Sequence, residues 1–598
     1  MDRVLLLNMP FVSLGRPAIG ISLLKPRLKQ EGIQCDVAYP NLFFAECAGL
    51  RAYSLINDQM SPAFFVGDWL FAQHLFADRL DCETYVATLR AHLKDPGEFE
   101  LLMQTREQVP AFLDACLEKF RIADYGIIGF TTTFEQNLAS LALARRIKTQ
   151  YPEKTIVFGG TNCEGVMGLE LHRSFPWIDY VCSGESDYTF PRLVKAVFSG
   201  QPVLEIGGVL HRQGGVSVLA GPPDQAHEMD RLPDPDFDDY FAALARSVIG
   251  SEISPALLIE TARGCWWGAK SHCTFCGLNG ATMTFRAKSA PRVLAELERQ
   301  KQRYGINRFL AVDNIMAHNY FKDLLPLLKE RRPGVSLFYE IKANLNRRQV
   351  ELLSDAGVKA IQPGIESLST HVLHLMNKGV TAIQNIQLLK WCREFGVDLA
   401  WNLLYGFPGE TPEDYQETAR TIEAVYHLKP PGAVSVIRLD RFSPYFNSPE
   451  SYGLVNIRPF DIYRYIYPLP PERIANVAYF FQYDYGDGRR PDSYMRETLE
   501  RVKAWKENGG GDLTKRYGAD PEMLITDTRP GRPPLQYALN GIQRQVYDYC
   551  QEARSRASLE SFVGMQNGWL DAFLEQMLAW QLMIREGNQH LSLAVTAS

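Results

Sequence analysis

Short apolar segments alternate with helical patterns in the N-terminal part of the chain. We expect mostly helix over residues 41–120, and further helices at 18–30 and up to Arg146. The apolar segments, which we expect to be buried strands, are Val4–Asn8, Gly126–Phe130, Thr155–Phe158 and Asp179–Cys182. This alternation predicts an α/β fold with a doubly wound, Rossmann-like parallel sheet, in which ligands bind beyond the carboxyl ends of the strands.

A second series of strands and helices follows a Pro- and Asp-rich stretch at residues 230–240. Its helical patterns are clearest at 292–302, 320–331 and 410–426. Its strand candidates are Leu257–Thr261, Arg308–Val312, Leu337–Ile341, Ala360–Pro363, Asp398–Leu404 and Ala433–Leu439. Six strand–helix units predict a partial or complete TIM-type β/α barrel.

The pattern changes again near the end of the sequence. Helices are expected at Ile542–Cys550, Leu559–Met565 and Leu570–Trp580, followed by a hairpin around Gly587–Asn588. Three helices and a hairpin suggest a mostly helical, winged-helix-like module. We therefore divide the chain into a Rossmann-like domain with a helical insertion (1–229), a linker (230–250), a barrel (251–470) and a C-terminal domain (471–598).

Composition excludes several classes of protein. The 598 residues carry a net charge of −6 and are 46% hydrophobic, so neither a polybasic nucleic-acid binder nor a disordered chain fits. No apolar run approaches the roughly 20 residues that span a bilayer. Eleven thinly spread cysteines do not form a disulfide framework, and the N-terminus lacks the pattern of a signal peptide. We expect a cytoplasmic protein.

Three of the cysteines are spaced for metal chemistry. Cys265, Cys273 and Cys276 follow the first barrel strand in the segment TARGCWWGAKSHCTFCGLNG, with the spacing C-x7-C-x2-C. Three thiolates hold three irons of a [4Fe–4S] cluster and leave the fourth iron open to a ligand such as S-adenosylmethionine. The alternative is a zinc site in which His272 joins the three thiolates.

This cysteine segment resembles the cluster loop of radical S-adenosylmethionine (SAM) enzymes, and more narrowly of the cobalamin-dependent members that mature ribosomally made peptides (RiPPs). The superfamily usually has C-x3-C-x2-C, and the longer loop here, with GLNG after it, is similar to the peptide-maturation group. The segment Arg441–Phe446 (RFSPYF) also resembles that group. The resemblance covers residues 1–460 and, more loosely, the C-terminal part.

The resemblance implies contacts to SAM at the ends of the barrel strands. The positions that match are Phe275, Asp313, Asn314, Glu340, Lys342, Glu366, Ser367, Leu404 and Tyr405. Asp313 and Asn314 stand where the family has a Gly-Gly-Glu motif, so this sequence departs from the family there. A solvated loop charge or a structural salt bridge is the alternative role for each acidic residue.

The resemblance also implies cobalamin at the carboxyl edge of the N-terminal sheet. The matching positions are Pro10, Thr131, Thr132, Thr133, Gly159, Gly160, Thr161, Asn162, Ser183, Gly184 and Glu185. The D-x-H-x-x-G signature is absent, so no histidine is an obvious lower axial ligand. A nucleotide-binding or purely structural flavodoxin-like domain is the alternative.

Together these features predict an enzyme with a [4Fe–4S] cluster, SAM and cobalamin as cofactors. The hypothesis is that a 5′-deoxyadenosyl radical abstracts hydrogen from an unactivated carbon of a precursor peptide, leading to C-methylation or cyclisation. We expect an electron donor of the flavodoxin or ferredoxin type, and neither nucleic acid nor membrane as a partner. The alternatives are modification of a small molecule, such as an antibiotic or tetrapyrrole precursor, and a non-catalytic cobalamin or iron–sulfur sensor. The C-terminal domain is either a leader-peptide binder or a packing domain.

Overall fold

The computed structural model describes residues 2–76, 80–93, 95–280, 282–507, 509–518, 522–564 and 568–597. Its contacts divide the chain into two compact units. Unit 1 comprises Met1–Ile259, Gln302–Ile306 and Asn456–Tyr483, and unit 2 comprises Glu260–Lys301, Asn307–Val455 and Asp484–Ser598. The chain therefore crosses from one unit to the other several times. Residues 230–250, predicted as a linker, lie within unit 1, and the predicted boundary at 470 lies within its last segment.

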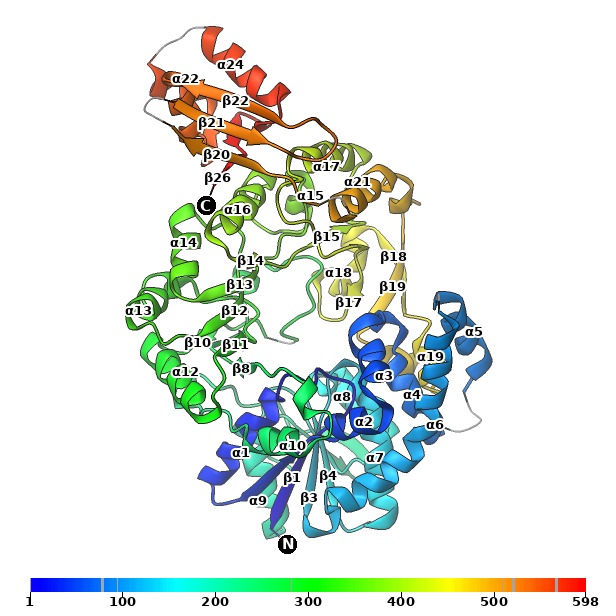
Figure 1. The fold of residues 1–598 in the computed structure, drawn as a ribbon. Coiled ribbons are helices and arrows are strands. Elements are labelled where there is room, and N and C mark those ends of the chain that lie inside the picture. Colours follow the sequence, from blue (N-terminus) through cyan, green and yellow to red (C-terminus); the bar gives the residue numbers. More distant parts are fainter. Residues whose placement is uncertain are drawn as a thin grey trace. The chain divides into compact units, whose positions relative to one another are not determined.

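Unit 1 is built on a seven-stranded sheet in the order β2-β1-β3-β4-β5-β6-β7. Figure 1 shows β1, β3 and β4 next to one another in this sheet. The first five positions are parallel and the last two pairings are antiparallel. The strands are β1 (Arg3–Asn8), β2 (Gln34–Ala38), β3 (Ile127–Thr131), β4 (Thr155–Gly159), β5 (Tyr180–Cys182), β6 (Val209–Gln213) and β7 (Val216–Leu219). The order reverses between β1 and β3, which is the switch point where doubly wound sheets bind ligands.

Helices cover this sheet, as its apolar strands require. Val4 and Leu6 of β1 pack in one core with Ile21 of α1 and Leu193 of α9. The helices of unit 1 are α1 (Ile19–Gln30), α2 (Pro40–Ala48), α3 (Leu50–Ser54), α4 (Val66–Phe76), α5 (Cys82–His92), α6 (Pro96–Lys119), α7 (Asn137–Gln150), α8 (Val166–Ser174), α9 (Thr189–Ser199), α10 (Asp238–Arg246), α19 (Tyr463–Ile466) and α20 (Pro471–Val477). The predicted parallel sheet and the helical insertion at 41–120 are confirmed.

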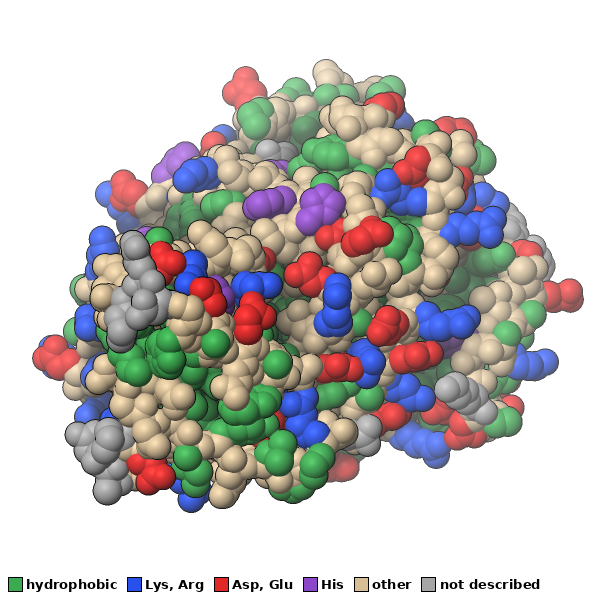
Figure 2. All heavy atoms as spheres, turned by 90° about the horizontal axis from the view of Figure 1, so that it is seen from above, with side chains coloured by type: hydrophobic (Ala, Val, Ile, Leu, Met, Phe, Trp, Pro, Cys, Tyr) green, Lys and Arg blue, Asp and Glu red, His purple; other side chains and the backbone are tan. Residues whose placement is uncertain are grey.

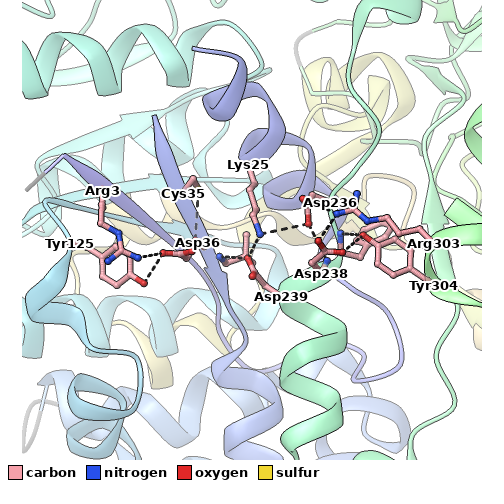
Figure 3. A network of polar contacts seen from close by, with 12 residues as sticks. Arg3, Lys25, Cys35, Asp36, Tyr125, Asp236, Asp238, Asp239, Arg303 and Tyr304 are labelled. Atoms are coloured by element: carbon pink, nitrogen blue, oxygen red, sulfur yellow. Dashed lines mark hydrogen bonds and ion pairs between the residues drawn. The ribbon is translucent and has the colours of Figure 1, made fainter. Parts of the chain in front are cut away.

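Polar contacts join the Asp-rich stretch at residues 230–240 to the rest of unit 1 (Figure 3). Asp239 accepts hydrogen bonds from the Lys25 ammonium at 2.6 Å and from the backbone N–H of Val37 at 2.8 Å. Asp238 pairs with the Arg303 guanidinium and accepts a hydrogen bond from the Tyr304 hydroxyl at 3.0 Å. The carboxylates of this stretch therefore have specific partners in the unit.

Unit 2 contains the parallel strands of the predicted barrel. Strands β14, β13, β12 and β11 lie side by side in that order, and β15 pairs with β16 in a separate parallel pair. Their bounds are β11 (Arg308–Ala311), β12 (Ser336–Glu340), β13 (Val358–Gln362), β14 (Asp398–Leu399), β15 (Asn402–Tyr405) and β16 (Ala433–Val436); β8 (Leu257–Ile259) precedes the unit boundary. The barrel strands are thus present, with the predicted strand 398–404 divided between two sheets.

Helices follow these strands in the alternating order expected of a β/α barrel. They are α11 (Trp266–Ser271), α12 (Ala290–Tyr304), α13 (Leu324–Arg331), α14 (Arg347–Asp355), α15 (Thr370–Leu375), α16 (Ala382–Phe395), α17 (Pro412–Ala424) and α18 (Pro444–Asn447). Short strands accompany them: β9 (Ala262–Arg263), β10 (Arg286–Ala287) and β17 (Leu439–Asp440). Strands β18 (Leu454–Pro459) and β19 (Phe480–Tyr485) lie mostly in the 456–483 segment of unit 1.

The C-terminal module has the predicted order of three helices and a hairpin. Helices α22 (Ile542–Tyr549), α23 (Arg556–Val563) and α24 (Gly568–Ala579) precede the antiparallel pair β24 (Met583–Glu586) and β25 (Gln589–Ser592), and β23 (Arg554–Ser555) completes a three-stranded wing. Met565, at the predicted end of the second helix, lies outside the described residues. The sequence did not predict a second sheet, which follows α21 (Arg496–Glu507). Its strands are β20 (Leu513–Tyr517), β21 (Glu522–Asp527), β22 (Leu535–Asn540) and β26 (Val595–Thr596).

The surface agrees with the near-balanced composition. On the face drawn in Figure 2, acidic and basic side chains are interspersed rather than gathered by sign. Within the described residues, no helix combines the length and the apolarity that a membrane crossing requires.

Candidate functional site

The cysteine loop is held in shape by its own backbone. Cys265 caps the N-terminus of α11, where its Sγ accepts a hydrogen bond from the backbone N–H of Gly268 at 3.2 Å. The N–H of Cys276 donates to the carbonyl of Cys273 at 3.1 Å, forming a tight turn, and the N–H of Thr274 between them donates to Met376 at 3.1 Å. The turn is therefore anchored to the segment that follows α15.

The three thiols are electrostatic neighbours. Burial raises the pKa of Cys276 to about 12, and the charges of Cys273 and Cys265 add to this rise, whereas Lys378 opposes it. Burial also raises the pKa of Cys265, again with a contribution from Cys273. Thiols in such a site lose their protons when a cation binds them, because the metal supplies the compensating charge.

The cysteine loop was predicted to hold either a [4Fe–4S] cluster or a single zinc ion. Among the described residues, no three His, Cys, Asp or Glu side chains converge on one point as the ligands of one ion do. A [4Fe–4S] cluster binds each thiolate through a different iron, so the sulfurs need not share a point. His272, the fourth ligand of the zinc alternative, has its Nε2 2.8 Å from the carbonyl oxygen of Cys276. That hydrogen bond occupies one of its two ring nitrogens.

Two lysines face the cysteine loop. Lys378 pairs with Glu366 at 3.3 Å, and although burial opposes it, Glu366 and the thiol of Cys273 raise the pKa of this lysine. Lys342 lies 3.7 Å from the centre of the Trp267 ring and donates to the carbonyl of Lys378. Burial and the neighbouring Lys378 lower the pKa of Lys342 to about 8. The site therefore holds positive charge where thiolates and an anionic ligand group would gather.

The two tryptophans of the cysteine loop bind it to neighbouring parts of the barrel. The indole N–H of Trp266 donates to Met316 at 3.0 Å, and that of Trp267 donates to Asn377 at 3.1 Å. Gly379 has a φ of +63°, and a Cβ there would lie 2.2 Å from the Trp267 ring, so only glycine allows this contact. The extra residues between Cys265 and Cys273 thus form helix α11 and its two anchors.

Some of the positions predicted to contact SAM have structural roles. Asp313 is buried, and its carboxylate accepts hydrogen bonds from the hydroxyl and, at 2.7 Å, the N–H of Thr261. Burial raises the pKa of Asp313 to about 7. Ser367 is buried, and its hydroxyl accepts a hydrogen bond from the N–H of Ser369 at 3.0 Å. The Asn314 side chain donates to Asn279, just beyond the cysteines.

The remaining predicted positions lie near one another and near the cysteine loop. Glu340 ends β12, and burial together with the charge of Glu366 raises its pKa to about 7, while Lys378 opposes the rise. Phe275 lies between the last two cysteines, and its ring contacts Phe407 edge-on at 5.7 Å. The structure therefore brings the loops after β12, β13 and β15 to the cysteine loop, as barrel topology predicts. The N–H of Leu404 donates to the Glu366 carbonyl at 2.9 Å.

In unit 1 the predicted cobalamin positions gather at the carboxyl edge of the sheet. The N–H of Thr132 donates to Gly159 at 2.8 Å, and its hydroxyl donates to the same carbonyl at 3.1 Å. Asn162 exchanges two hydrogen bonds with the backbone of Phe134, at 3.1 and 2.9 Å. These bonds join the loops that follow β3 and β4.

The other predicted positions of this edge divide into buried and exposed groups. Pro10 is buried, Thr133 caps the turn that ends at Gln136, and Ser183 accepts from the N–H of Gly165 at 2.9 Å. The Glu185 carboxylate accepts from the N–H of Ala226 at 3.0 Å. Gly160, Thr161 and Gly184 are exposed along the edge, and the partly exposed positions are Thr131, Thr133, Gly159, Asn162 and Glu185.

Comparison with known proteins identifies the central part of the chain. Residues 259–422 match the Radical SAM superfamily, and this match implies a [4Fe–4S] cluster and SAM as cofactors. The chain is 26% identical over 304 residues to an uncharacterised methyltransferase of Pyrococcus horikoshii, covering 50% of this chain and 64% of the relative. It is 22% identical over 350 residues to the anaerobic magnesium-protoporphyrin IX monomethyl ester cyclase of Rubrivivax gelatinosus, covering 56% of this chain and 60% of the relative. The chain thus spans about three fifths of the length of these relatives.

A solved structure resembles this chain over both units. The cobalamin-dependent S-adenosylmethionine radical enzyme OxsB, with aqua-cobalamin bound, superposes with a TM-score of 0.56 over 81% of this chain and 64% of that chain. The sequence identity is 14%, so the likeness concerns the fold. The predicted α/β fold class is therefore confirmed.

Sequence reasoning missed residues whose role depends on distant contacts. Lys378 lies between Glu366 and the cysteine thiols, yet in the sequence it stands in an ordinary turn, NKGV. Glu410 ends the motif GFPGE and is buried, and its carboxylate accepts hydrogen bonds from the N–H groups of Gly406 and Phe407. The glycines of GFPGE directly after a strand were the available signal for this loop.

Proposed function

We propose that the protein is a cobalamin-dependent radical SAM enzyme that modifies an unactivated carbon. The observation that carries the proposal is the cysteine loop: Cys265, Cys273 and Cys276 begin a radical SAM domain, and two lysines face their thiols. When bound, the reduced cluster and SAM supply a 5′-deoxyadenosyl radical that abstracts hydrogen from the substrate. An sp³ C–H bond offers neither an acidic proton nor a leaving group, so hydrogen abstraction is the chemistry it requires.

The chain's own residues hold the reactants in this proposal. Cys265, Cys273 and Cys276 bind three irons, and the charges of Lys342 and Lys378 favour the anionic cluster and the SAM carboxylate. Glu340 and Glu366 accept hydrogen bonds from the ribose hydroxyls and the amine. The further SAM contacts are Phe275, Leu404 and Tyr405. Closing the site from water protects a radical from side reactions.

Cobalamin is proposed at the carboxyl edge of the unit 1 sheet, beside the switch point between β1 and β3. Support comes from the partly exposed Thr131 and the exposed Gly160, Thr161 and Gly184, and from the cobalamin named in the structure of similar fold. Cobalamin supplies a methyl group or accepts an electron, which makes methylation and oxidative cyclisation the two outcomes. The methyltransferase and the cyclase among the relatives support the same pair.

We propose a ribosomally made precursor peptide as the substrate, on the length of the cysteine loop and the segment Arg441–Phe446. The test is anaerobic incubation of the reconstituted chain with SAM, cobalamin, a reductant and a candidate precursor peptide. Release of 5′-deoxyadenosine supports the enzyme, and its absence with a complete cluster contradicts it. A product heavier by one methylene indicates methylation, whereas loss of two hydrogens indicates cyclisation or desaturation.

A small molecule is the second candidate substrate, favoured by the similarity to a protoporphyrin ester cyclase. An unchanged peptide mass together with 5′-deoxyadenosine formed only in the presence of a tetrapyrrole would favour this candidate. Cytoplasmic location and an electron donor of the flavodoxin or ferredoxin type are part of the proposal, because the cluster must be reduced to act.

A further inference from the structure

The segment 484–495, hereafter the strap, lies across the loop that follows β15. It belongs to unit 2 but stands 62 or more residues beyond the end of the radical SAM match at residue 422. Its sequence, DYGDGRRPDSYM, has no apolar periodicity and carries no motif of its own. The contacts of the strap show why these polar residues are present.

Glu410 is the centre of these contacts. Its buried carboxylate accepts hydrogen bonds from the N–H of Gly406 at 2.8 and 2.9 Å and from the N–H of Phe407 at 2.8 Å. The hydroxyls of Tyr415 and of Tyr494, which belongs to the strap, each donate to it at 2.5 Å. A buried carboxylate needs such donors because desolvation otherwise penalises its charge.

Other strap residues hold the same loop from its backbone. The Tyr485 hydroxyl donates to the carbonyl of Gly406. A Cβ at Gly406 would lie 2.8 Å from that hydroxyl, so the glycine leaves room for it. The Arg489 guanidinium, itself paired with Asp487, donates to the carbonyls of Phe407 at 3.4 Å and Glu410 at 3.3 Å.

The strap also fixes the end of β15 itself. The Tyr405 hydroxyl donates to Asp492 at 2.8 Å, and the Tyr405 ring packs with Met495 and Tyr415 in one buried cluster. The loop that is held in this way contacts the cysteine loop directly, through the rings of Phe407 and Phe275 at 5.7 Å. A continuous path of contacts therefore runs from the strap to the residue between Cys273 and Cys276.

We propose that Tyr485, Arg489 and Tyr494 are positioning residues that hold the loop 404–410 in the conformation that binds SAM. The inference rests on the proposed function, in which Leu404 and Tyr405 contact SAM. Without the strap, Glu410 loses a hydrogen-bond donor and the loop loses three hydrogen bonds to its backbone carbonyls. The loop is then less ordered, and the free energy needed to order it weakens SAM binding. The radical SAM domain of this chain is then complete only with residues from outside it.

The test uses the full chain with its cluster reconstituted under anaerobic conditions. SAM is titrated against the reduced cluster, and the change in the electron paramagnetic resonance spectrum gives the Kd. Tyr494→Phe removes the donor to Glu410 but keeps the ring stacked on Tyr415, 5.6 Å away. Tyr517→Phe is the matched control, because its hydroxyl also donates to a carboxylate, Asp548, at 2.8 Å, but in the C-terminal module.

We expect Tyr494→Phe to raise the Kd for SAM about tenfold, the loss expected for one hydrogen bond to a charged group. Its iron content stays at the wild-type level, and the rate of 5′-deoxyadenosine release at saturating SAM is kept, so the effect falls on KM. If Tyr494→Phe does not fold, Tyr485→Phe carries the same expectation, because it leaves every donor to Glu410 in place.

A wild-type Kd in Tyr494→Phe would overturn the inference, as would an equal rise in Tyr517→Phe. Loss of iron in Tyr494→Phe would also overturn it, since the strap would then serve cluster assembly. A wild-type chain that assembles no cluster, or whose cluster spectrum does not respond to SAM, would instead contradict the proposed function, and the role of the strap would fall with it.

Discussion

At the scale of single residues, the three cysteines are not interchangeable with the other eight. Cys276→Ser replaces a proposed thiolate ligand by a hydroxyl, which binds iron poorly, so we expect the reconstituted protein to lose its cluster absorbance and most of its iron. Cys47→Ser, at an exposed position on α2, is the control and should keep both. Full iron content in Cys276→Ser would contradict its role as a ligand.

Two buried carboxylic acids in unit 1 predict a pH dependence of stability. Burial raises the pKa of Asp68 to about 7, and burial together with the charge of Asp68 raises that of Glu135 to about 8. Both pKa values lie above those of the same groups in the unfolded chain. The two protonated groups therefore stabilise the fold fully near pH 4, and this stabilisation declines as the pH rises and is lost once the pH has passed about 7 to 8.

Asp68→Asn tests this dependence. The amide keeps an oxygen that accepts from the N–H of Leu138, which Asp68 bonds at 2.8 Å, but it does not titrate. From pH 5 to pH 8, we expect the variant's free energy of unfolding to rise relative to wild type, by at most about 1.4 kcal/mol per pH unit. Urea unfolding at several pH values measures this difference. Asp58→Asn, an exposed position, should show no such trend; a constant difference for Asp68→Asn would contradict the prediction.

The residues that sequence reasoning found and missed differ in the range of their contacts. The cysteines are recognisable because their spacing within one short segment is typical of metal ligands. Asp313 was placed at the end of a strand, but its carboxylate bonds Thr261, 52 residues earlier, and no local pattern encodes that pairing. The bond from Tyr494 to Glu410 spans 84 residues and is equally invisible to periodicity.

At the scale of elements, the C-terminal wing is bound to a barrel helix. Glu586 of β24 accepts a hydrogen bond from the N–H of Ile383, in the first turn of α16, at 3.0 Å. The Lys390 ammonium of α16 donates to the carbonyls of Gln551 at 2.9 Å and Ser592 at 2.7 Å. These contacts support the packing role for the module.

Glu586→Ala tests the packing role, because it removes an acceptor from the N-terminus of α16. We expect a loss of about 1 kcal/mol, as for other helix caps, and faster amide hydrogen exchange in residues 382–386. Glu575→Ala is the control: Glu575 is exposed on α24 and pairs with Arg585 at 3.1 Å. Unchanged exchange in α16 would show that the wing does not stabilise this helix.

The elements that could be predicted are those with a strong apolar pattern. Strands β1, β3 and β4 are almost wholly buried, and their runs of Val, Ile, Leu and Phe are plain in the sequence. Strand β2 buries only Val37, and strand β20 buries a lysine, Lys515, next to the exposed Arg516. Weak patterns of that kind do not separate an edge strand from a loop.

At the scale of the whole molecule, the chain order does not match the order of its compact units. Residues 456–483 return to unit 1 after the barrel and add α19 and α20. Tyr467 accepts a hydrogen bond from the Asn137 side chain at 2.6 Å, and Asn476 donates to Glu170 at 2.9 Å. Sequence patterns are local, so they assign these residues to the end of the barrel and the start of the C-terminal domain and cannot show that they complete the N-terminal unit.

Two truncations separate the contribution of this returning segment. A chain ending at Val455 and a chain ending at Tyr483 both lack the strap and the C-terminal module, and they differ only in residues 456–483. We expect the shorter chain to lose protection from hydrogen exchange in α7 and α8, because Asn137 and Glu170 become buried groups with fewer partners, at a cost of about 1–3 kcal/mol each.

Point variants refine the comparison: Tyr467→Phe in the full chain removes the bond to Asn137 alone and should weaken protection in α7 but not in α8. Equal protection of both helices in the two truncated chains would mean that unit 1 folds without its last segment, and the N-terminal domain would then end where the sequence first placed it, near residue 229.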